Sequence, residues 1–135
     1  MTRYLVDTNH LGDAVRKVSR VRDRIQRQHR QGDVFGTCGP VLCELMVGVF
    51  RRKDAKPTRR RLAVLLDLVR IWPVDMAVAD HYGEIYGALQ TKGRALSQVD
   101  MMLGAMCRQS NLVLLTTDTD FHALPDIRTE DWLGG

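Results

Sequence analysis

The chain has 135 residues, of which 44% are hydrophobic, and a formal net charge of +4 from 20 basic and 16 acidic residues. This size predicts one domain over residues 1–135, with a core that needs no disulfide or metal staple. No apolar run is long enough to span a bilayer, and the run before Asp7 is too short for a signal peptide, so we expect a cytoplasmic protein without membrane association.

The first half of the chain is predicted to contain two short strands and four helices. In chain order these are strand 4–6, helix 11–15, helix 18–30, strand 34–35, a helix from Pro40 to Val49 and helix 60–69, with a basic break around Pro57 between the last two. The apolar residues of the helix that begins at Pro40 recur at helical spacing, and proline is favoured in a first helical turn.

The second half is predicted to contain strand 71–74, helix 78–92, helix 97–108, strand 112–115 and a short strand at 127–128. Strands that alternate with helices indicate an α/β layered domain with a mostly parallel sheet. In such sheets functional sites gather at the carboxyl ends of the strands, and both Asp7 and Asp118 follow predicted strands.

Two acids in the first half are candidate metal ligands. Asp7 follows the strand YLV, although a strand-ending aspartate is also a common helix cap. Glu44 lies within the apolar run VLCELMVGV, where a buried carboxylate without a basic neighbour needs a cation; the alternative is that Glu44 faces solvent. Thr8 and Asn9 are expected to orient the Asp7 carboxylate.

The second half supplies the remaining acids. Asp100 completes the capping-box pattern SQVD, and an acid in a first helical turn stays ionised and able to hold a cation. Asp118 and Asp120 follow the buried run LVLL, and a turn-forming role is open for each. We prefer Asp118 as the fourth acid because it lies closer to the strand end, with Asp120 as the alternative.

These acids make chemical sense as one set. Carboxylates that are brought together repel one another, and a divalent cation removes that repulsion. All-oxygen ligands favour Mg²⁺ or Mn²⁺. A bound cation activates water and stabilises phosphoryl charge, so the set suits phosphodiester hydrolysis. The chain has no GxSxG or P-loop motif, and its three cysteines and four histidines lack metal-ligand spacing.

Basic residues crowd two stretches, 16–30 and 51–61. Charge runs are usually solvated helix faces, but two of them beside a carboxylate site favour a polyanionic partner.

Four segments together resemble the PIN domain, and more narrowly the VapC ribonuclease toxins of bacterial toxin–antitoxin pairs. They are LVDTN, CELMVG, SQVDMMLGAM and LLTTDTDF, in family order and across nearly the whole chain. His10 departs from the family pattern, in which an apolar residue commonly follows DTN. The helix after Asp100 is also less alanine-rich than usual, and TTDTDF offers two acids for one role.

The resemblance implies a three-layer α/β/α sandwich with a mostly parallel sheet. It implies Mg²⁺ or Mn²⁺ held by Asp7, Glu44, Asp100 and Asp118, with Thr116 as a further polar residue of the site. It also implies endonucleolytic cleavage of RNA, often transfer RNA, a homodimer, and silencing by a VapB-like antitoxin. The residues expected to contact RNA or antitoxin are Arg51, Arg52, Lys53, Arg59 and Arg60.

Two other functions stay open. A non-catalytic RNA- or partner-binding module would use the arginine-rich stretches alone. A receiver-like or phosphatase-like domain would use Asp7 as a phosphoryl acceptor, but the chain lacks a DxDx[TV] run at Asp7 and has a single acid at the first strand.

Overall fold

The computed structural model describes residues 1–134 and contains a five-stranded sheet in the order β3-β2-β1-β4-β5. Every neighbouring pair of strands is parallel. The strands are β1 (Arg3–Val6), β2 (Val34–Thr37), β3 (Val69–Ile71), β4 (Val113–Leu115) and β5 (Arg128–Glu130). The predicted mostly parallel sheet is therefore confirmed.

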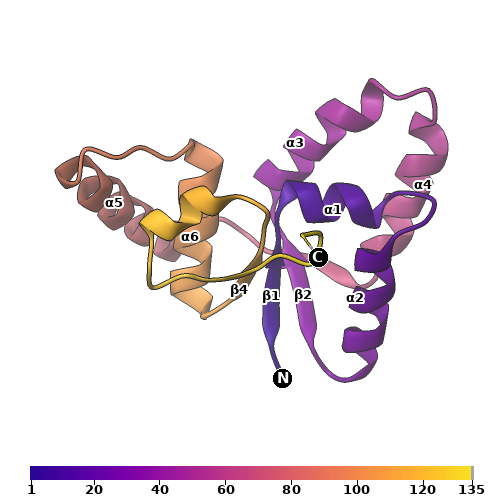
Figure 1. Ribbon diagram of the computed structural model, residues 1–135, viewed down its shortest axis with the longest axis horizontal. Helices are drawn as coiled ribbons and strands as arrows, with labels where there is room; N and C mark the ends of the chain where they lie inside the picture. The colour runs from indigo at the N-terminus through magenta and orange to yellow at the C-terminus, as the bar shows by residue number, and fades with distance from the viewer. Residues whose placement is uncertain (135) are drawn as a thin grey trace.

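Six helices flank the sheet. They are α1 (Thr8–Ala14), α2 (Arg20–Arg30), α3 (Gly39–Phe50), α4 (Ala55–Leu65), α5 (Met76–Thr91) and α6 (Gln98–Ser110), and a short 3₁₀ helix, η1 (Thr119–Ala123), follows β4. Figure 1 shows α5 and α6 on one side of the sheet and α1, α2 and α4 on the other. This arrangement confirms the three-layer α/β/α sandwich.

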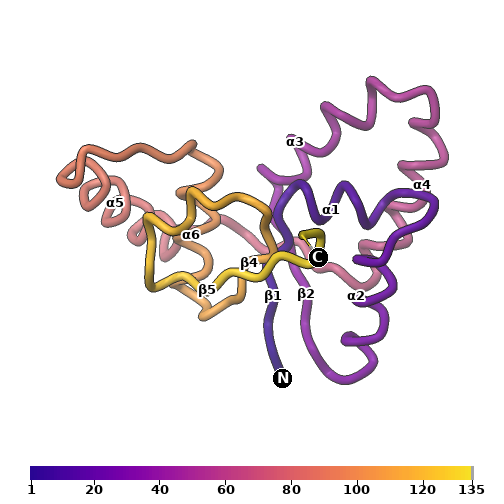
Figure 2. The backbone as a smooth tube through the Cα atoms, viewed as in Figure 1, coloured from indigo at the N-terminus to yellow at the C-terminus, as the bar shows by residue number. Residues whose placement is uncertain are grey.

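The helices on the two sides diverge beyond the end of the sheet. In Figure 2 the α3–α4 segment rises on one side of β1 and the α5–α6 segment extends on the other. The carboxyl end of β1 lies between them, so residues far apart in the sequence border the same edge of the sheet.

The inner strands are buried on both faces. Leu5, Val6, Leu114 and Leu115 have no exposed surface, because helices or the C-terminal segment cover each face of the sheet. Strands covered on both faces read as continuous apolar runs, which is why YLV and LVLL stand out in the sequence. No described helix combines the length and apolar character needed to cross a membrane.

Several predicted boundaries were wrong. The helix expected at 60–69 is α4, Ala55–Leu65, and it includes Pro57, because proline in a first turn removes an N–H that has no helical partner. The strand expected at 71–74 is β3, which ends at Ile71, two residues before Pro73. The helix expected at 11–15 begins at Thr8, and the last strand is 128–130 rather than 127–128.

Gly36 in β2 is required by close packing on the sheet face. A Cβ at this position would collide with the Trp72 ring, which lies directly over the glycine. The guanidinium of Arg3 in turn lies 5.6 Å from the centre of the Trp72 ring. The Trp72 ring therefore packs in the space that a side chain at position 36 would occupy.

We expect Gly36→Ala to lower the free energy of unfolding by about 1–3 kcal/mol, because the Trp72 ring must leave its seat. Gly87→Ala is the matched control: Gly87 lies in α5 with open space around its Cβ position, so alanine there should stabilise the protein by about 0.4–1 kcal/mol. Urea unfolding followed by circular dichroism measures both. Equal stability of Gly36→Ala and the parent protein would contradict this packing argument.

Candidate active site

Asp7 lies at the carboxyl end of β1 and begins α1. One of its carboxylate oxygens accepts a hydrogen bond from the Thr8 backbone N–H at 2.7 Å, so the predicted cap role is real. The other oxygen accepts a hydrogen bond from the Thr116 hydroxyl at 2.8 Å, just beyond β4. Asp7 therefore caps a helix and also joins the ends of two neighbouring strands.

The position of β1 explains why a site forms here. β1 lies between β2 and β4, so the chain leaves it toward one half of the sheet and later returns on its other side. Ligands of open parallel sheets bind in the crevice outside the strand ends at such a reversal. Asp7 and Thr116 are the residues that follow the two strands at this point.

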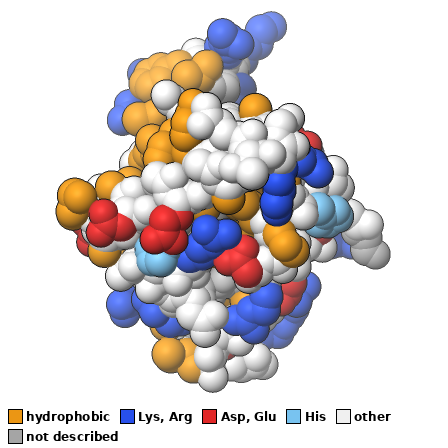
Figure 3. Space-filling view, turned by 90° about the vertical axis from the view of Figure 1, so that its left-hand side faces the viewer, with side chains coloured by type: hydrophobic (Ala, Val, Ile, Leu, Met, Phe, Trp, Pro, Cys, Tyr) orange, Lys and Arg blue, Asp and Glu red, His pale blue; other side chains and the backbone are white. Residues whose placement is uncertain are grey.

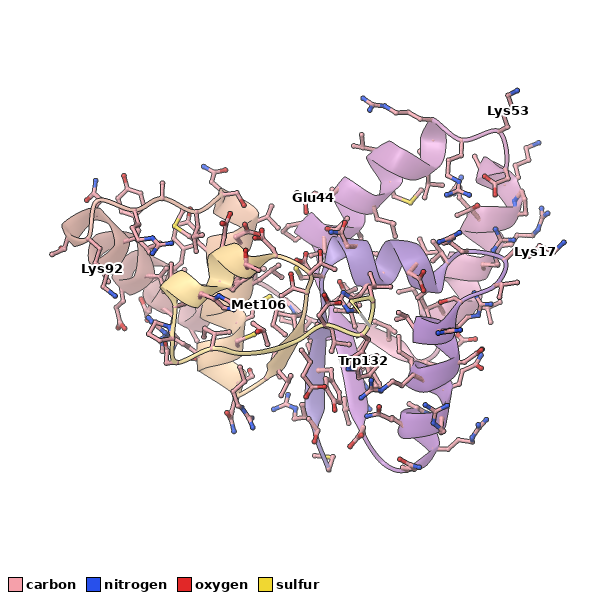
Figure 4. All side chains as sticks on the ribbon, viewed as in Figure 1. Lys17, Glu44, Lys53, Lys92, Met106 and Trp132 are labelled. Carbon is pink, nitrogen blue, oxygen red and sulfur yellow. The ribbon has the colours of Figure 1, made fainter. Side chains whose placement is uncertain are left out.

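Glu44 reaches the same edge from α3, but the expectation that it is buried was wrong. The residue is exposed, and its Oε1 accepts a hydrogen bond from the Thr8 hydroxyl at 2.9 Å. Figure 4 shows Glu44 near the end of α3 that faces the sheet, above the start of α1. The helix buries Val41, Leu45 and Val49 instead, so Glu44 lies beside the buried stripe rather than within it.

Asp100 lies in the first turn of α6 and is half-buried. Its backbone N–H donates to the Ser97 hydroxyl at 3.1 Å, which confirms the predicted cap. Burial is the main cause that raises the pKa of Asp100 to about 6; the Ser97 hydrogen bond lowers this pKa, and the charges of Asp118, Asp7 and Glu44 contribute to the rise. The fold thus brings all four predicted acids close enough to interact electrostatically.

Asp118 and Asp120 differ in burial and in their effect on Asp100. Asp118 is half-buried and caps η1, where its Oδ1 accepts the Asp120 N–H at 2.8 Å, so the turn role is also real. Its own N–H donates to the Thr116 hydroxyl at 3.1 Å. Asp120 is exposed and is absent from the charges that raise the pKa of Asp100.

Hydroxyl and amide groups link the acids. Thr8 and Thr116 touch Glu44 and Asp7 as described, whereas the Asn9 side chain donates to the hydroxyl of Thr117 at 2.8 Å rather than to an acid. We did not single out Thr117 from the sequence, although the doubled threonine of TTDTDF was the available signal. These contacts fix the loop after β4 against the start of α1.

A cleft of about 430 Å³ begins at Thr8 and Glu44, and Arg52 and Thr58 also line it. Its wall includes Gly48, which has open space around its Cβ position. Arg52 pairs with Asp54 at 2.7 Å. The other predicted contact residues, Arg51, Lys53, Arg59 and Arg60, are exposed and, within residues 1–134, have no carboxylate within 4 Å.

The four acids supply the type of ligand atom that a hard divalent cation prefers. Within residues 1–134, no three acidic, histidine or cysteine side chains lie close enough to share one ion. All four acids offer oxygen ligands, however, and each is exposed or half-buried, so an ion reaches them from solvent. Burial first and then the neighbouring carboxylates raise the pKa of Asp100, and a bound cation would offset both effects on its ionised form.

We expect the metal-free protein to lose stability as the pH rises from 3.8 to about 6, because folded Asp100 holds its proton more tightly than the unfolded chain does. Asp100→Asn should remove this loss and raise stability at neutral pH by about 1 kcal/mol, a figure reduced for solvent screening. Thermal unfolding in EDTA across this pH range measures the effect.

Asp126→Asn is the control of opposite sign. A hydrogen bond from Arg108 lowers the pKa of Asp126, so its ionised form stabilises the fold above the unfolded pKa and that contribution is lost as the pH falls. Asp126→Asn should therefore lower stability at neutral pH. A pH profile of Asp100→Asn that matches the parent protein would refute the raised pKa of Asp100.

Known proteins resemble this chain over its whole length. Ribonuclease VapC2 of Rickettsia felis is 23% identical over 130 residues, which cover 96% of this chain and 97% of that protein. The tRNA(fMet)-specific endonuclease VapC of Salmonella typhimurium is 27% identical over 137 residues, which cover 98% and 99%.

Solved structures share the fold. The crystal structure of VapBC2 from Rickettsia felis bound to a promoter DNA fragment matches with a TM-score of 0.83 at 22% identity, over 97% of this chain and 99% of that chain. FitAcB from Neisseria gonorrhoeae matches with a TM-score of 0.73 at 26% identity, over 95% and 96%. The sequence model of the PIN domain matches residues 4–127, and the chain therefore belongs to the PIN domain family.

Proposed function

We propose that this protein is a metal-dependent endoribonuclease of the VapC type, the toxin of a type II toxin–antitoxin module. The observation that carries the proposal is the proximity of the four acids: hydroxyl contacts connect Glu44 to Thr8 and Asp7 to Thr116, and the charges of Asp118, Asp7 and Glu44 act on half-buried Asp100. Separate elements supply these four acids to one edge of the sheet. The relatives of similar length are named as ribonucleases, which supports the same reaction class.

In this proposal Asp7, Glu44, Asp100 and Asp118 hold Mg²⁺ or Mn²⁺. When bound, such an ion lowers the pKa of a coordinated water and stabilises charge on the phosphoryl group. Thr116 and Thr8 keep Asp7 and Glu44 in place through the hydroxyl contacts at 2.8 and 2.9 Å. The half-buried position of Asp100 strengthens its interaction with any cation in the site.

RNA is the proposed substrate. Exposed basic side chains in the α3–α4 segment, residues 39–65, support this proposal. Arg51, Lys53, Arg59 and Arg60 offer positive charge to phosphates along the same segment that carries Glu44. Transfer RNA is the finer proposal, and it comes from the printed name of the Salmonella relative.

A VapB-like antitoxin is the proposed partner. Several matching structures are toxin–antitoxin complexes, and the cleft between Glu44 and Arg52 is a suitable seat for a peptide segment beside the acids. A segment in that cleft would block access to the site. Because the proposed substrate is RNA and two of the matching VapBC complexes are bound to DNA, we place the protein in the cytoplasm.

The alternative function is a non-catalytic RNA- or partner-binding module with a relict site. One observation favours it, namely that no three ligand side chains of residues 1–134 lie close enough to share an ion. The two functions differ in whether RNA is cleaved when Mg²⁺ or Mn²⁺ is added.

We expect Asp7→Asn, Glu44→Gln and Asp100→Asn each to lower RNA cleavage at least a hundredfold, because each removes a charged ligand from the metal site. Cleavage of a labelled RNA pool with Mn²⁺ and with EDTA measures this. Asp67→Asn, an exposed acid at the end of α4, is the matched control and should retain full activity. Cleavage that persists in EDTA would contradict the metal mechanism, and no cleavage with either metal would support the binding module.

The same assay identifies the fourth acid. We expect Asp118→Asn to lose cleavage and metal affinity, whereas Asp120→Asn keeps most of both, because Asp118 is the acid that acts on Asp100. Isothermal titration with Mn²⁺ gives the affinities. The reverse ranking would assign the role to Asp120.

A homodimer is the proposed oligomeric state. The outer face of α3 exposes Cys43, Val47 and Phe50, with exposed fractions of 57% for Val47 and 65% for Phe50. Met76, at the start of α5, is 73% exposed. Figure 3 shows hydrophobic side chains gathered on the upper part of the face that looks toward the α5–α6 side, below basic side chains at the tip. Apolar patches of this kind mark protein interfaces.

We expect Val47→Glu combined with Phe50→Glu to shift the protein from dimer to monomer, because two charges would be buried in the interface. Sedimentation velocity measures the mass. Val18→Glu is the control, since Val18 is 80% exposed and lies in the loop between α1 and α2. An unchanged mass in the double variant would exclude this face as the interface.

A further inference from the structure

Three arginines form a stripe along α2. Arg20, Arg24 and Arg27 follow one another at spacings of four and three residues, which places them on one face of the helix. Together with Asp23 and Trp132 they line a hollow of about 350 Å³. None of these residues lines the cleft that contains Glu44.

Only part of the stripe stabilises the helix that carries it. Arg24 donates a hydrogen bond to Gln28 at 2.6 Å, and Arg27 lies in the last turn, where the helix dipole favours a positive charge. Arg20 is the first residue of α2, where the helix dipole opposes a positive charge, and Ser19 already caps this end by accepting the Arg22 N–H at 3.0 Å. Like charges three and four residues apart also repel each other. An anion bound from solvent would therefore lower the electrostatic energy of these arginines.

The arginines of the stripe have few carboxylates near them. Glu130 lies 4.0 Å from Arg24, and Asp23, which is exposed, is among the residues that line the hollow. In the described part of the chain, Arg20 and Arg27 have no carboxylate within 4 Å. The hollow therefore keeps a net positive charge that is open to solvent.

A flat aromatic platform is fixed beside the stripe. The guanidinium of Arg24 lies 3.9 Å from the centre of the Trp132 ring. The Trp132 backbone N–H donates to buried His10 at 2.9 Å, and its ring packs edge-on against Tyr4 at 5.2 Å. The Arg24–Trp132 pair is thus held in place before any ligand arrives.

We propose that this hollow, defined here as the α2 exosite (Arg20, Asp23, Arg24, Arg27 and Trp132), binds a single-stranded segment of RNA outside the catalytic cleft. Arg20 and Arg27 bind phosphates, and a base stacks against the Arg24–Trp132 pair. This inference rests on the proposed function, since it extends the contact with an RNA substrate.

The composition of the exosite favours RNA over an acidic protein segment. Single-stranded RNA is bound by cations that follow its backbone together with aromatic or guanidinium planes that stack its bases. An acidic amphipathic peptide needs an apolar groove for its side chains, and Trp132 is the one apolar residue among the five that line the hollow.

The test compares two triple variants of equal charge change. The exosite variant is Arg20→Gln, Arg24→Gln, Arg27→Gln. The control is Arg70→Gln, Lys92→Gln, Arg94→Gln, which removes three exposed cations from other elements. Binding of a fluorescein-labelled, mixed-sequence single-stranded RNA is measured by anisotropy in EDTA across a salt series, so that no cleavage intervenes.

We expect the exosite variant to bind RNA at least tenfold more weakly. The slope of its plot of log affinity against log salt should become shallower by about 1.4, since the two lost phosphate contacts of Arg20 and Arg27 remove about 0.7 each. The control should stay within about twofold of the parent protein. Equal slopes for the two variants would overturn the exosite.

Two further arms make the assignment sharper. The variant Arg20→Gln, Arg27→Gln leaves the Arg24–Trp132 pair intact and should show the same slope change as the triple variant, because it removes both phosphate contacts. This variant covers the case in which the triple variant fails to fold. Inorganic polyphosphate carries charge without bases, so we expect it to compete more weakly than RNA of equal charge. Equal competition would show a plain anion surface and overturn the RNA assignment.

Cleavage separates the exosite from the proposed function. With Mn²⁺, the exosite variant should cleave a short RNA at the parent rate and a long RNA with a raised KM. If the parent protein cleaves no RNA but the slope change appears, the nuclease proposal fails and the exosite stands. If cleavage occurs and the slopes are equal, the exosite fails and the nuclease proposal stands.

Discussion

The unfavourable surroundings of an ionised Asp100, which is half-buried near three other carboxylates at the end of β1, are the constraint on which the rest of the site depends. Asp118, Asp7 and Glu44 each push the pKa of Asp100 upward, on top of the effect of burial. Such an arrangement costs folding free energy, because the group must be ionised at neutral pH in a place that favours the neutral form. A bound divalent cation would offset this loss of folding free energy, because it stabilises the ionised carboxylates.

Local hydrogen bonds hold the repelling groups in place. Asp7 and Asp118 cap helices with their own side chains, and Ser97 caps the helix that carries Asp100. Thr116 ties the loop after β4 to Asp7. The capping interpretation and the metal-ligand interpretation of these acids are therefore compatible, since a cap fixes the backbone while leaving carboxylate oxygens at the sheet edge.

The surface charge has a spatial order that the net charge of +4 does not reveal. Acids converge at the strand ends, whereas cations line the α3–α4 segment and one face of α2. A negative centre with positive flanks suits a long polyanion whose scissile phosphate meets a cation while its neighbours meet arginines. The two proposed RNA contacts differ in that the α2 exosite adds an aromatic plane.

The sequence by itself determined the parallel α/β class and the positions of the acids relative to the strands. Buried parallel strands need continuous apolar runs, and Asp7 and Asp118 follow two such runs. Helix periodicity located α3 and α5, but not the start of α4, because Pro57 is compatible with a first turn as well as with a break.

Only the tertiary structure decided which side chains meet. Glu44 faces solvent beside Thr8 because packing of α3 against α1 fixes which side of the helix is buried. The C-terminal segment docks through a hydrogen bond from Trp132 to His10, a histidine whose pKa is lowered by burial. These contacts join residues more than 30 positions apart, and no local pattern of residues specifies a partner at that distance.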